Sequence, residues 1–454
     1  MSDQSDVVII EALENQVKMI PRTRTSSVLR EEIVSATLSC GLACHVIPKR
    51  GFTKKVGIFA TRYGSIDLSF TLDGQALETP PGIAHFLEHQ LFKKAGGEDV
   101  LMEFGKYGAS SNAFTDYCTT AYYFTASGHF EKNLELLLTF VTQPFFEAEN
   151  VAKEKLIIEQ ELRMYEDSPD HRLYKNLMRV LYTTHPVRLD IGGEVSDIQG
   201  IDRDLLESCY RKFYNPANML LIVAGDVDPG EIFRHAEAIF APSAFKALGP
   251  IGRRWPVEPP GVKERVVREE MAVSRPRVLM GFKDLGAVDG RALERELETS
   301  VVLDLFFGRS SAFYTRFYEQ GLIDDSFSFS FNSEDAFGFS LIGGETDKPE
   351  ELAEKVLFEL HQAKKVKLKA KDVERTKRKR LGKYIRSFDT PDGAAFLTMG
   401  SLQRGIDLFR VPQVISKMSA RALEGRLEEH FDERNYAVSI LNPKPGSTTP
   451  IEEE

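Results

Sequence analysis

The chain has 454 residues, of which 42% are hydrophobic and 28% charged, and its formal net charge is −10 at pH 7. This length exceeds what one hydrophobic core usually organises, so we expect two or more domains in a protein of ordinary soluble composition. The acidic balance excludes nucleic acid as a general partner, because a phosphate backbone requires a basic surface.

The sequence also predicts no membrane partner and no oxidising compartment. It has no run of about 20 apolar residues and no signal-peptide pattern, and it contains four cysteines. We therefore expect a cytoplasmic protein. Cys40, Cys44 and His45 could suggest a metal site, but on a predicted hairpin they lack a fourth ligand. We interpret the two cysteines as small buried side chains.

The first half of the chain begins with a polar segment without periodicity, residues 1–30, which we interpret as an extension. A first domain is expected over residues 31–242. Its predicted strands are 44–48, 56–63, one or two within 109–127, and one from 219 onward. Its predicted helices are 82–92, 99–107, 129–143, 148–167, 170–183 and 229–240.

The second half follows a stretch rich in proline and glycine, residues 243–264, which is typical of a linker. Over residues 265–443 the order of predicted elements recurs, and residues 444–454 form a tail. The predicted strands are 278–282, 327–331, 338–343 and 436–441, and the predicted helices are 289–307, 310–320, 348–363 and 370–387. The recurrence predicts an α+β protein of two homologous α/β domains, each a mixed, mostly antiparallel sheet flanked by helices. Basic residues between 364 and 386 are interpreted as a solvated helix face rather than a binding patch.

The segment PPGIAHFLEHQLF carries the strongest chemical signal in the sequence. On a helix, His85 and His89 lie one turn apart on the same face, so both imidazoles can reach one zinc ion. Glu88 lies beside them and can act as the general base for a zinc-bound water. The order is the inverse of the commoner His-Glu-x-x-His arrangement and is the inverzincin motif. Taken alone, the short pattern also fits buried or capping histidines.

A third ligand could come from the segment VAKEKLIIEQELRMYED. Glu154 and Glu161 lie two turns apart on one helix face, so one could bind zinc while the other orients a ligand histidine. Spacing alone does not choose between them, and a solvated face of glutamates is also possible. The aliphatic residues are expected to form the buried side of this helix: Leu156, Ile157, Ile158 and Leu162.

The chain resembles the pitrilysin and insulin-degrading-enzyme family of inverzincin zinc metallopeptidases, and within it the short bacterial processing-peptidase-like branch. The resemblance covers residues 40–443 and rests on GSIDLSF, GIAHFLEHQLF, GASSNAFTDYCTTAYYF, EKLIIEQELRMYEDSPDHRLY, HPVRLDIGG and FYNPANMLLIVAGDVDP. It implies one zinc ion held by His85, His89 and Glu161, with Glu88 as the general base and Glu154 as the outer glutamate that orients a ligand. It also implies that Asn112 and Ala113 bind the substrate backbone as an added strand.

What the resemblance implies as a function is a zinc metalloendopeptidase that hydrolyses extended or unfolded peptides in an enclosed chamber. Active members also use an Arg and a Tyr to stabilise the oxyanion. The corresponding segment here, RFYEQGLIDDSF, has Asp324 and Asp325 where the tyrosine is expected. We therefore expect a heterodimer with a homologous subunit that supplies Arg and Tyr, with a homodimer as the other possibility. An inactive structural subunit and a peptide-binding module of the same fold are the alternative functions.

Overall fold

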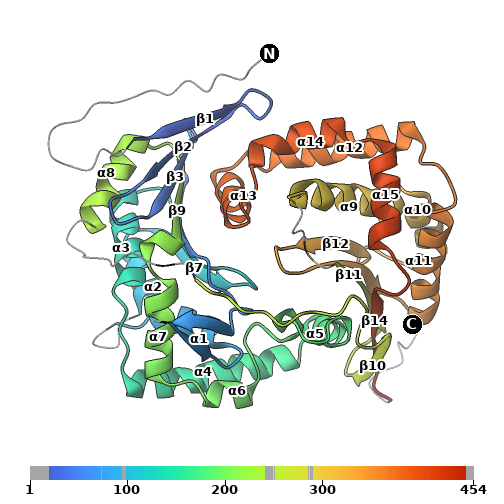
Figure 1. The fold of residues 1–454 in the computed structure, drawn as a ribbon, viewed down its shortest axis with the longest axis horizontal. Coiled ribbons are helices and arrows are strands. Elements are labelled where there is room, and N and C mark those ends of the chain that lie inside the picture. The colour runs from blue at the N-terminus through green and yellow to red at the C-terminus, as the bar shows by residue number, and fades with distance from the viewer. Residues whose placement is uncertain are drawn as a thin grey trace, which may run out of the picture. The chain divides into compact units, whose positions relative to one another are not determined.

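The structure, a computed structural model, describes residues 20–72, 74–94, 99–240, 249, 251–284, 286 and 290–445. The chain divides into two compact units, each built on one large β-sheet (Figure 1). The first unit comprises residues 1–160, 190–254 and 384–409, and the second comprises residues 161–189, 255–383 and 410–454. The two units thus alternate along the chain.

The sheet of the first unit has the strand order β1-β2-β3-β9-β4-β8-β7. The strands are β1 (Arg22–Ser26), β2 (Glu31–Thr37), β3 (Ala43–Pro48), β4 (Lys55–Thr61), β7 (Ala109–Thr115), β8 (Thr120–Ala126) and β9 (Met219–Gly225). Only β3 and β9 pair in parallel. Every residue of β9 is buried, which explains its continuous apolar sequence MLLIVAG.

Helices and one small hairpin complete the first unit. They are β5 (Ser69–Leu72), β6 (Gln75–Glu78), α1 (Ile83–Leu91), α2 (Val100–Lys106), α3 (Phe130–Thr142), α4 (Ala148–Glu166, entered here up to residue 160), α6 (Val195–Gln199), α7 (Arg203–Phe213), α8 (Pro229–Phe240) and α13 (Pro391–Gln403). Although α13 comes late in the chain, its Ala394, Ala395 and Met399 join one buried cluster with Ile58 and Ile222 of the first sheet.

The sheet of the second unit has the order β10-β14-β11-β13-β12. Its strands are β10 (Val266–Met271), β11 (Arg277–Asp284), β12 (Ser328–Ser333), β13 (Gly338–Glu345) and β14 (Tyr436–Pro443). Its helices are α5 (Pro169–Leu181), α9 (Ala292–Phe307), α10 (Ala312–Glu319), α11 (Pro349–Ala363), α12 (Ala370–Arg386), α14 (Val411–Lys417) and α15 (Ala420–His430). Leu177 of α5 packs on Gly281 of β11, where an added Cβ would lie 3.1 Å from the leucine.

The two sheets share a topology. The order β3-β9-β4-β8-β7 repeats as β10-β14-β11-β13-β12, and only the first pair in each series is parallel. This repeat confirms the predicted fold class of two α/β units with mixed, mostly antiparallel sheets. The predicted domains are contiguous, 31–242 and 265–443. In the structure, α5 lies within the first predicted range but belongs to the second unit, and α13 lies within the second range but belongs to the first unit.

The N-terminal segment and the linker add two further differences from the sequence-based division. β1 lies within residues 1–30, which the sequence suggested to be an extension, while residues 1–19 lie outside the described residues. Most of the predicted tail, residues 446–454, also lies outside them. The second part of the predicted linker is anchored, because the Glu258 carboxylate accepts hydrogen bonds from the backbone N–H groups of Thr183, Thr184 and His185 and from Lys283 Nζ.

The expected burial of α4 is wrong for two of its four aliphatic residues. Ile158 and Leu162 are buried, but Leu156 is 61% exposed and Ile157 47% exposed. The buried side of the helix runs through Val151, Glu154, Ile158 and Leu162 at helical spacing. A glutamate, and not an isoleucine, therefore takes one of the buried positions, and this places Glu154 in the interior.

The expected solvated face of α12 is also incomplete. Lys377 is 7% exposed and donates hydrogen bonds to the carbonyl oxygens of Ser416 and Met418 at 2.9 and 3.0 Å. Arg380 binds the buried Asp304. Part of the basic stretch therefore holds the second unit together, because these cations find acceptors that only the folded chain supplies.

Candidate metal centre

Helix α1 begins at a glycine that the fold requires. Gly82 has a φ angle of 85°, a left-handed conformation, and an added Cβ would lie 2.2 Å from the carbonyl oxygen of Gly192. The helix then buries its apolar residues Ile83, Ala84, Phe86 and Leu87. His85 and His89 are partly exposed, and Glu88 is only 8% exposed.

The structure brings His85, His89 and Glu161 together. One ligand atom from each lies within 4.8 Å of the others, and this is the one such group of His, Cys, Asp and Glu found among the described residues. The two imidazole rings meet edge to face with their centroids 4.6 Å apart. Glu161 enters from α4 and not from the motif helix. Two imidazole nitrogens and one carboxylate oxygen are a donor set that suits zinc and leaves a fourth position open.

Glu154 lies behind this group. Its Oε1 is 3.0 Å from His89 Nδ1, its Oε2 is 3.2 Å from Lys93 Nζ, and its side chain is 3% exposed. Burial raises the pKa of Glu154, but the hydrogen bond with His89 and the charge of Lys93 outweigh that effect, so its pKa lies below the usual value. The ionised carboxylate thus accepts the Nδ1 proton of His89 and leaves Nε2 for a metal. This arrangement is the geometric basis for the different roles predicted for Glu154 and Glu161.

Glu88 is oriented by a residue that the sequence analysis did not select. The hydroxyl of Thr115, the last residue of β7, donates to Glu88 Oε2 at 2.6 Å. Behind it the hydroxyls of Tyr122 and Tyr214 lie 2.9 Å apart, and burial raises the pKa of both phenols. The Glu88 charge acts on both phenols and contributes to the raised pKa of each. Thr115 follows Asn112 and Ala113 in the segment NAFT, but its contact with Glu88 depends on where β7 ends relative to α1.

Asn112 and Ala113 lie on β7, an edge strand of the first sheet. Asn112 is exposed, and its side-chain oxygen accepts the backbone N–H of Ala113 at 2.9 Å. Because an edge strand presents unpaired backbone groups, it is a place where an extended peptide can be added. These two residues do not belong to the histidine cluster, but Thr115 of the same strand contacts Glu88.

The two aspartates at the position of the expected tyrosine are engaged in ion pairs within the second unit. Asp324 lies 2.7 Å from Arg275, and Asp325 lies 3.0 Å from Arg309. A carboxylate bound to arginine cannot donate hydrogen bonds to a developing oxyanion. Asp324 and Asp325 therefore do not supply the hydroxyl donor that the family resemblance implies at this position, although Arg316 and Tyr318 lie nearby in the same segment.

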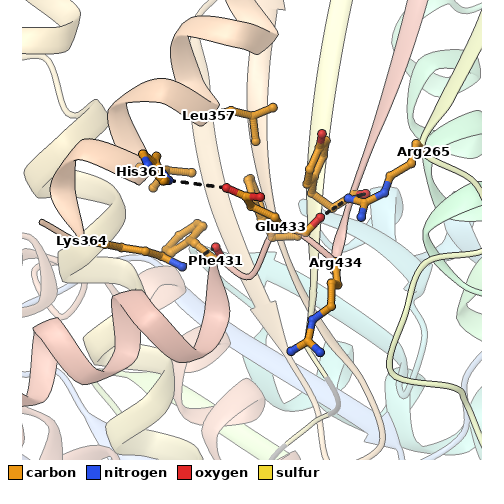
Figure 2. A pocket seen from close by; sticks show the side chains of 10 residues that line it. Arg265, Leu357, His361, Lys364, Phe431, Glu433 and Arg434 are labelled. Atoms are coloured by element: carbon orange, nitrogen blue, oxygen red, sulfur yellow. Dashed lines mark hydrogen bonds and ion pairs between the residues drawn. The ribbon is translucent and has the colours of Figure 1, made fainter.

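A separate pocket of about 590 Å³ lies in the second unit, between α11 and β14 (Figure 2). Its floor includes Phe282 and Phe431, and its charged rim residues already have partners. His361 faces Glu433 at 3.5 Å, and Lys364 Nζ donates to the carbonyl oxygen of Phe431 at 2.9 Å. The pocket contains none of the residues of the histidine cluster.

Comparison with known proteins finds relatives that are named zinc proteases and profiles of one peptidase family. A profile described as insulinase, peptidase family M16, matches residues 74–194, and a profile described as the peptidase M16 inactive domain matches residues 200–380. The chain belongs to peptidase family M16.

Within the described residues, each helix is too short or too polar to cross a membrane.

Several known proteins match this chain over almost its whole length, among them the following two. It is 38% identical over 420 residues to the uncharacterized zinc protease YmfH of Bacillus subtilis, a match that covers 92% of this chain and 98% of the relative. A crystal structure described as an M16-like peptidase from Alicyclobacillus acidocaldarius is 34% identical with a TM-score of 0.88, and the match covers 95% of this chain and all of that one.

Pitrilysin shares the fold at 16% identity and a TM-score of 0.73. That match covers 94% of this chain but only 47% of the pitrilysin chain. This chain therefore corresponds in length to about half of pitrilysin.

Proposed function

We propose that this chain is a zinc-dependent metalloendopeptidase that hydrolyses extended or unfolded peptides, with Glu88 as the general base. The observation that carries the proposal is the group formed by His85, His89 and Glu161, whose ligand atoms lie within 4.8 Å of one another beside Glu88. These three residues would hold one zinc ion. When bound, zinc supplies a Lewis acid that polarises a carbonyl group and acidifies water.

The residues of the chain would divide the remaining work. Glu88 accepts a proton from the attacking water and delivers it to the departing amine. Thr115 fixes the direction of the Glu88 carboxylate through the 2.6 Å hydrogen bond. The edge of β7 at Asn112 and Ala113 binds the peptide backbone as an added strand, so an extended segment is preferred to a folded one.

The working assembly in this proposal is a heterodimer with a homologous chain that supplies an Arg and a Tyr. Two features support it: Asp324 and Asp325 are bound to arginines, and this chain spans about half the length of pitrilysin. Two such chains would enclose a chamber. A cytoplasmic location stays a prediction.

The test is hydrolysis of an unfolded peptide by the purified chain, alone and with a homologous partner, before and after chelation. We expect chelator-sensitive cleavage that needs the partner. Glu88→Gln should keep zinc and lose about 10²- to 10⁴-fold in rate, as expected for loss of a general base. Full activity of the chain alone would contradict the heterodimer and favour a homodimer. Peptide binding without cleavage under all conditions would favour the inactive, peptide-binding alternative.

A further inference from the structure

Lys93 lies two residues after Leu91, the last residue of α1, and is part of no predicted site. Its Nζ is 3.2 Å from Glu154 Oε2, while the other oxygen of the same carboxylate, Oε1, is 3.0 Å from His89 Nδ1. Each oxygen of Glu154 thus has its own partner. Because Lys93 fixes one oxygen, the carboxylate cannot rotate without breaking an ion pair, and the other oxygen stays directed at the imidazole.

The charges at this place also require a cation. Glu154 is 3% exposed and Glu88 is 8% exposed, and Glu161 joins the histidine cluster. Among these carboxylates, Glu154 has Lys93 as its cationic partner, at 3.2 Å. A buried carboxylate without such compensation is costly, because water cannot solvate it there.

We propose that Lys93 is a positioning residue of the metal centre, which acts through Glu154 to hold His89 in the orientation that binds zinc. This inference rests on the proposed function, in that it concerns the same metal, but it predicts a property of the zinc affinity and not of hydrolysis. Arginine keeps both the positive charge and a long side chain that can hold the Glu154 carboxylate, so Lys93→Arg should replace lysine in large part.

The neighbouring Lys94 provides a matched control. Its Nζ binds Glu103 at 2.6 Å, and the side chains of Lys93 and Lys94 are 31% and 33% exposed. The two lysines have nearly the same sequence position, exposure and ion-pair chemistry, but only Lys93 is linked to a histidine of the cluster. A general effect of removing a positive charge near the site should therefore appear in both variants.

The experiment measures zinc affinity by competition with a chromogenic chelator, without peptide substrate. Lys93→Met should weaken zinc binding by about tenfold, the lower part of the range for outer partners of metal ligands. Lys93→Arg should restore most of the affinity, and Lys94→Met should match the wild type. In a Glu154→Gln background, Lys93→Met should have little further effect, because the residue through which it acts is already altered.

Several outcomes would overturn the inference. Unchanged zinc affinity in Lys93→Met would do so, as would an equal loss in Lys94→Met or a full additional loss in the Glu154→Gln background. If Lys93→Met does not fold, the milder Lys93→Gln is measured by the same criteria. A wild-type chain that binds no zinc would contradict the proposed function as well, whereas wild-type binding with an unaffected Lys93→Met variant would contradict the role of Lys93 alone.

Discussion

The two units share a topology but differ in the side chains of the helix that comes before the edge strand. In the first unit the order β4, α1, α2, β7, β8 places α1 before the edge strand, and in the second the order β11, α9, α10, β12, β13 places α9 there. Helix α1 presents imidazoles beside a carboxylate. Helix α9 instead buries Glu298 and Asp304, and cations hold both: Arg291 lies 3.4 Å from Glu298, and Lys379 lies 2.7 Å from Asp304.

This difference shows that the fold positions a helix beside a sheet edge but does not decide what the helix does. Acidic groups that cations already neutralise have little to gain from a metal ion, whereas an acidic group beside two imidazoles forms a ligand set. The match of the second half to the M16 inactive domain agrees with this comparison. Function on this fold therefore depends on particular side chains.

The largest expected effect tests the metal side of the comparison. Glu161→Gln should lower zinc affinity by more than the about 10- to 100-fold that is typical of outer partners, because it removes a ligand atom. Glu154→Gln should fall within that range, because His89 keeps its place in the cluster. Metal analysis and chelator competition measure both. The opposite ranking would exchange the roles of the two glutamates.

The next effect tests the ion-pair side. Asp304→Asn should lower the free energy of unfolding by about 2–3 kcal/mol, because the buried Asp304 carboxylate is the partner of Arg380, whose side chain is 24% exposed. Zinc affinity should not change. Urea denaturation gives the stability, and Asp325→Asn is the control, since its pair with Arg309 is 72% exposed on both sides and should contribute less than about 1 kcal/mol. Loss of zinc in Asp304→Asn would contradict the separation of the two roles.

A smaller effect concerns Glu258, which anchors the second unit. Burial raises its pKa, but hydrogen bonds from Lys283 and from the N–H groups of Thr183, His185 and Thr184 lower it further, to about 2. Because the pKa of Glu258 is lower in the folded than in the unfolded chain, its ionised carboxylate stabilises the fold. This stabilisation is complete above about pH 4.5 and is lost as the pH falls toward 2.

Glu258→Gln should therefore cost roughly 2 kcal/mol at pH 7, and the gap to the wild type should narrow at pH 3. Urea unfolding at both pH values measures it. A gap that is the same at pH 3 and pH 7 would show that ionised Glu258 is not the source of the stability.

The smallest effect concerns the link between the edge strand and the base. Thr115→Val should lower the rate of peptide hydrolysis by about tenfold, the equivalent of one hydrogen bond to a charged group, while zinc content stays constant. Thr115→Ser should retain most of the rate, because it keeps the hydroxyl. A valine variant with the wild-type rate would mean that the packing around Glu88 alone directs its carboxylate.

By itself the sequence determined many of the elements, their recurrence in two halves, and the helix that carries the chemistry, while β2, α7, β10, α13 and α15 are not among the predicted elements. Periodicity and turn residues act over one element, so β9, α1 and α3 could be predicted from local sequence. The spacing of His85 and His89 placed both on one face of a helix, because that relation depends only on helical geometry.

Only the tertiary structure decided the contacts between elements distant in the chain. The exchange of α5 and α13 between the units depends on which sheet face each helix covers, and no local pattern specifies this. The burial of Glu154 in place of Ile157 was likewise decided by packing. The contact of Glu154 with Lys93 and the hydrogen bond from Thr115 to Glu88 join segments 27 or more residues apart. The inverted motif could therefore be found in the sequence, but the groups that direct its histidine and its base appear only where the packed elements meet.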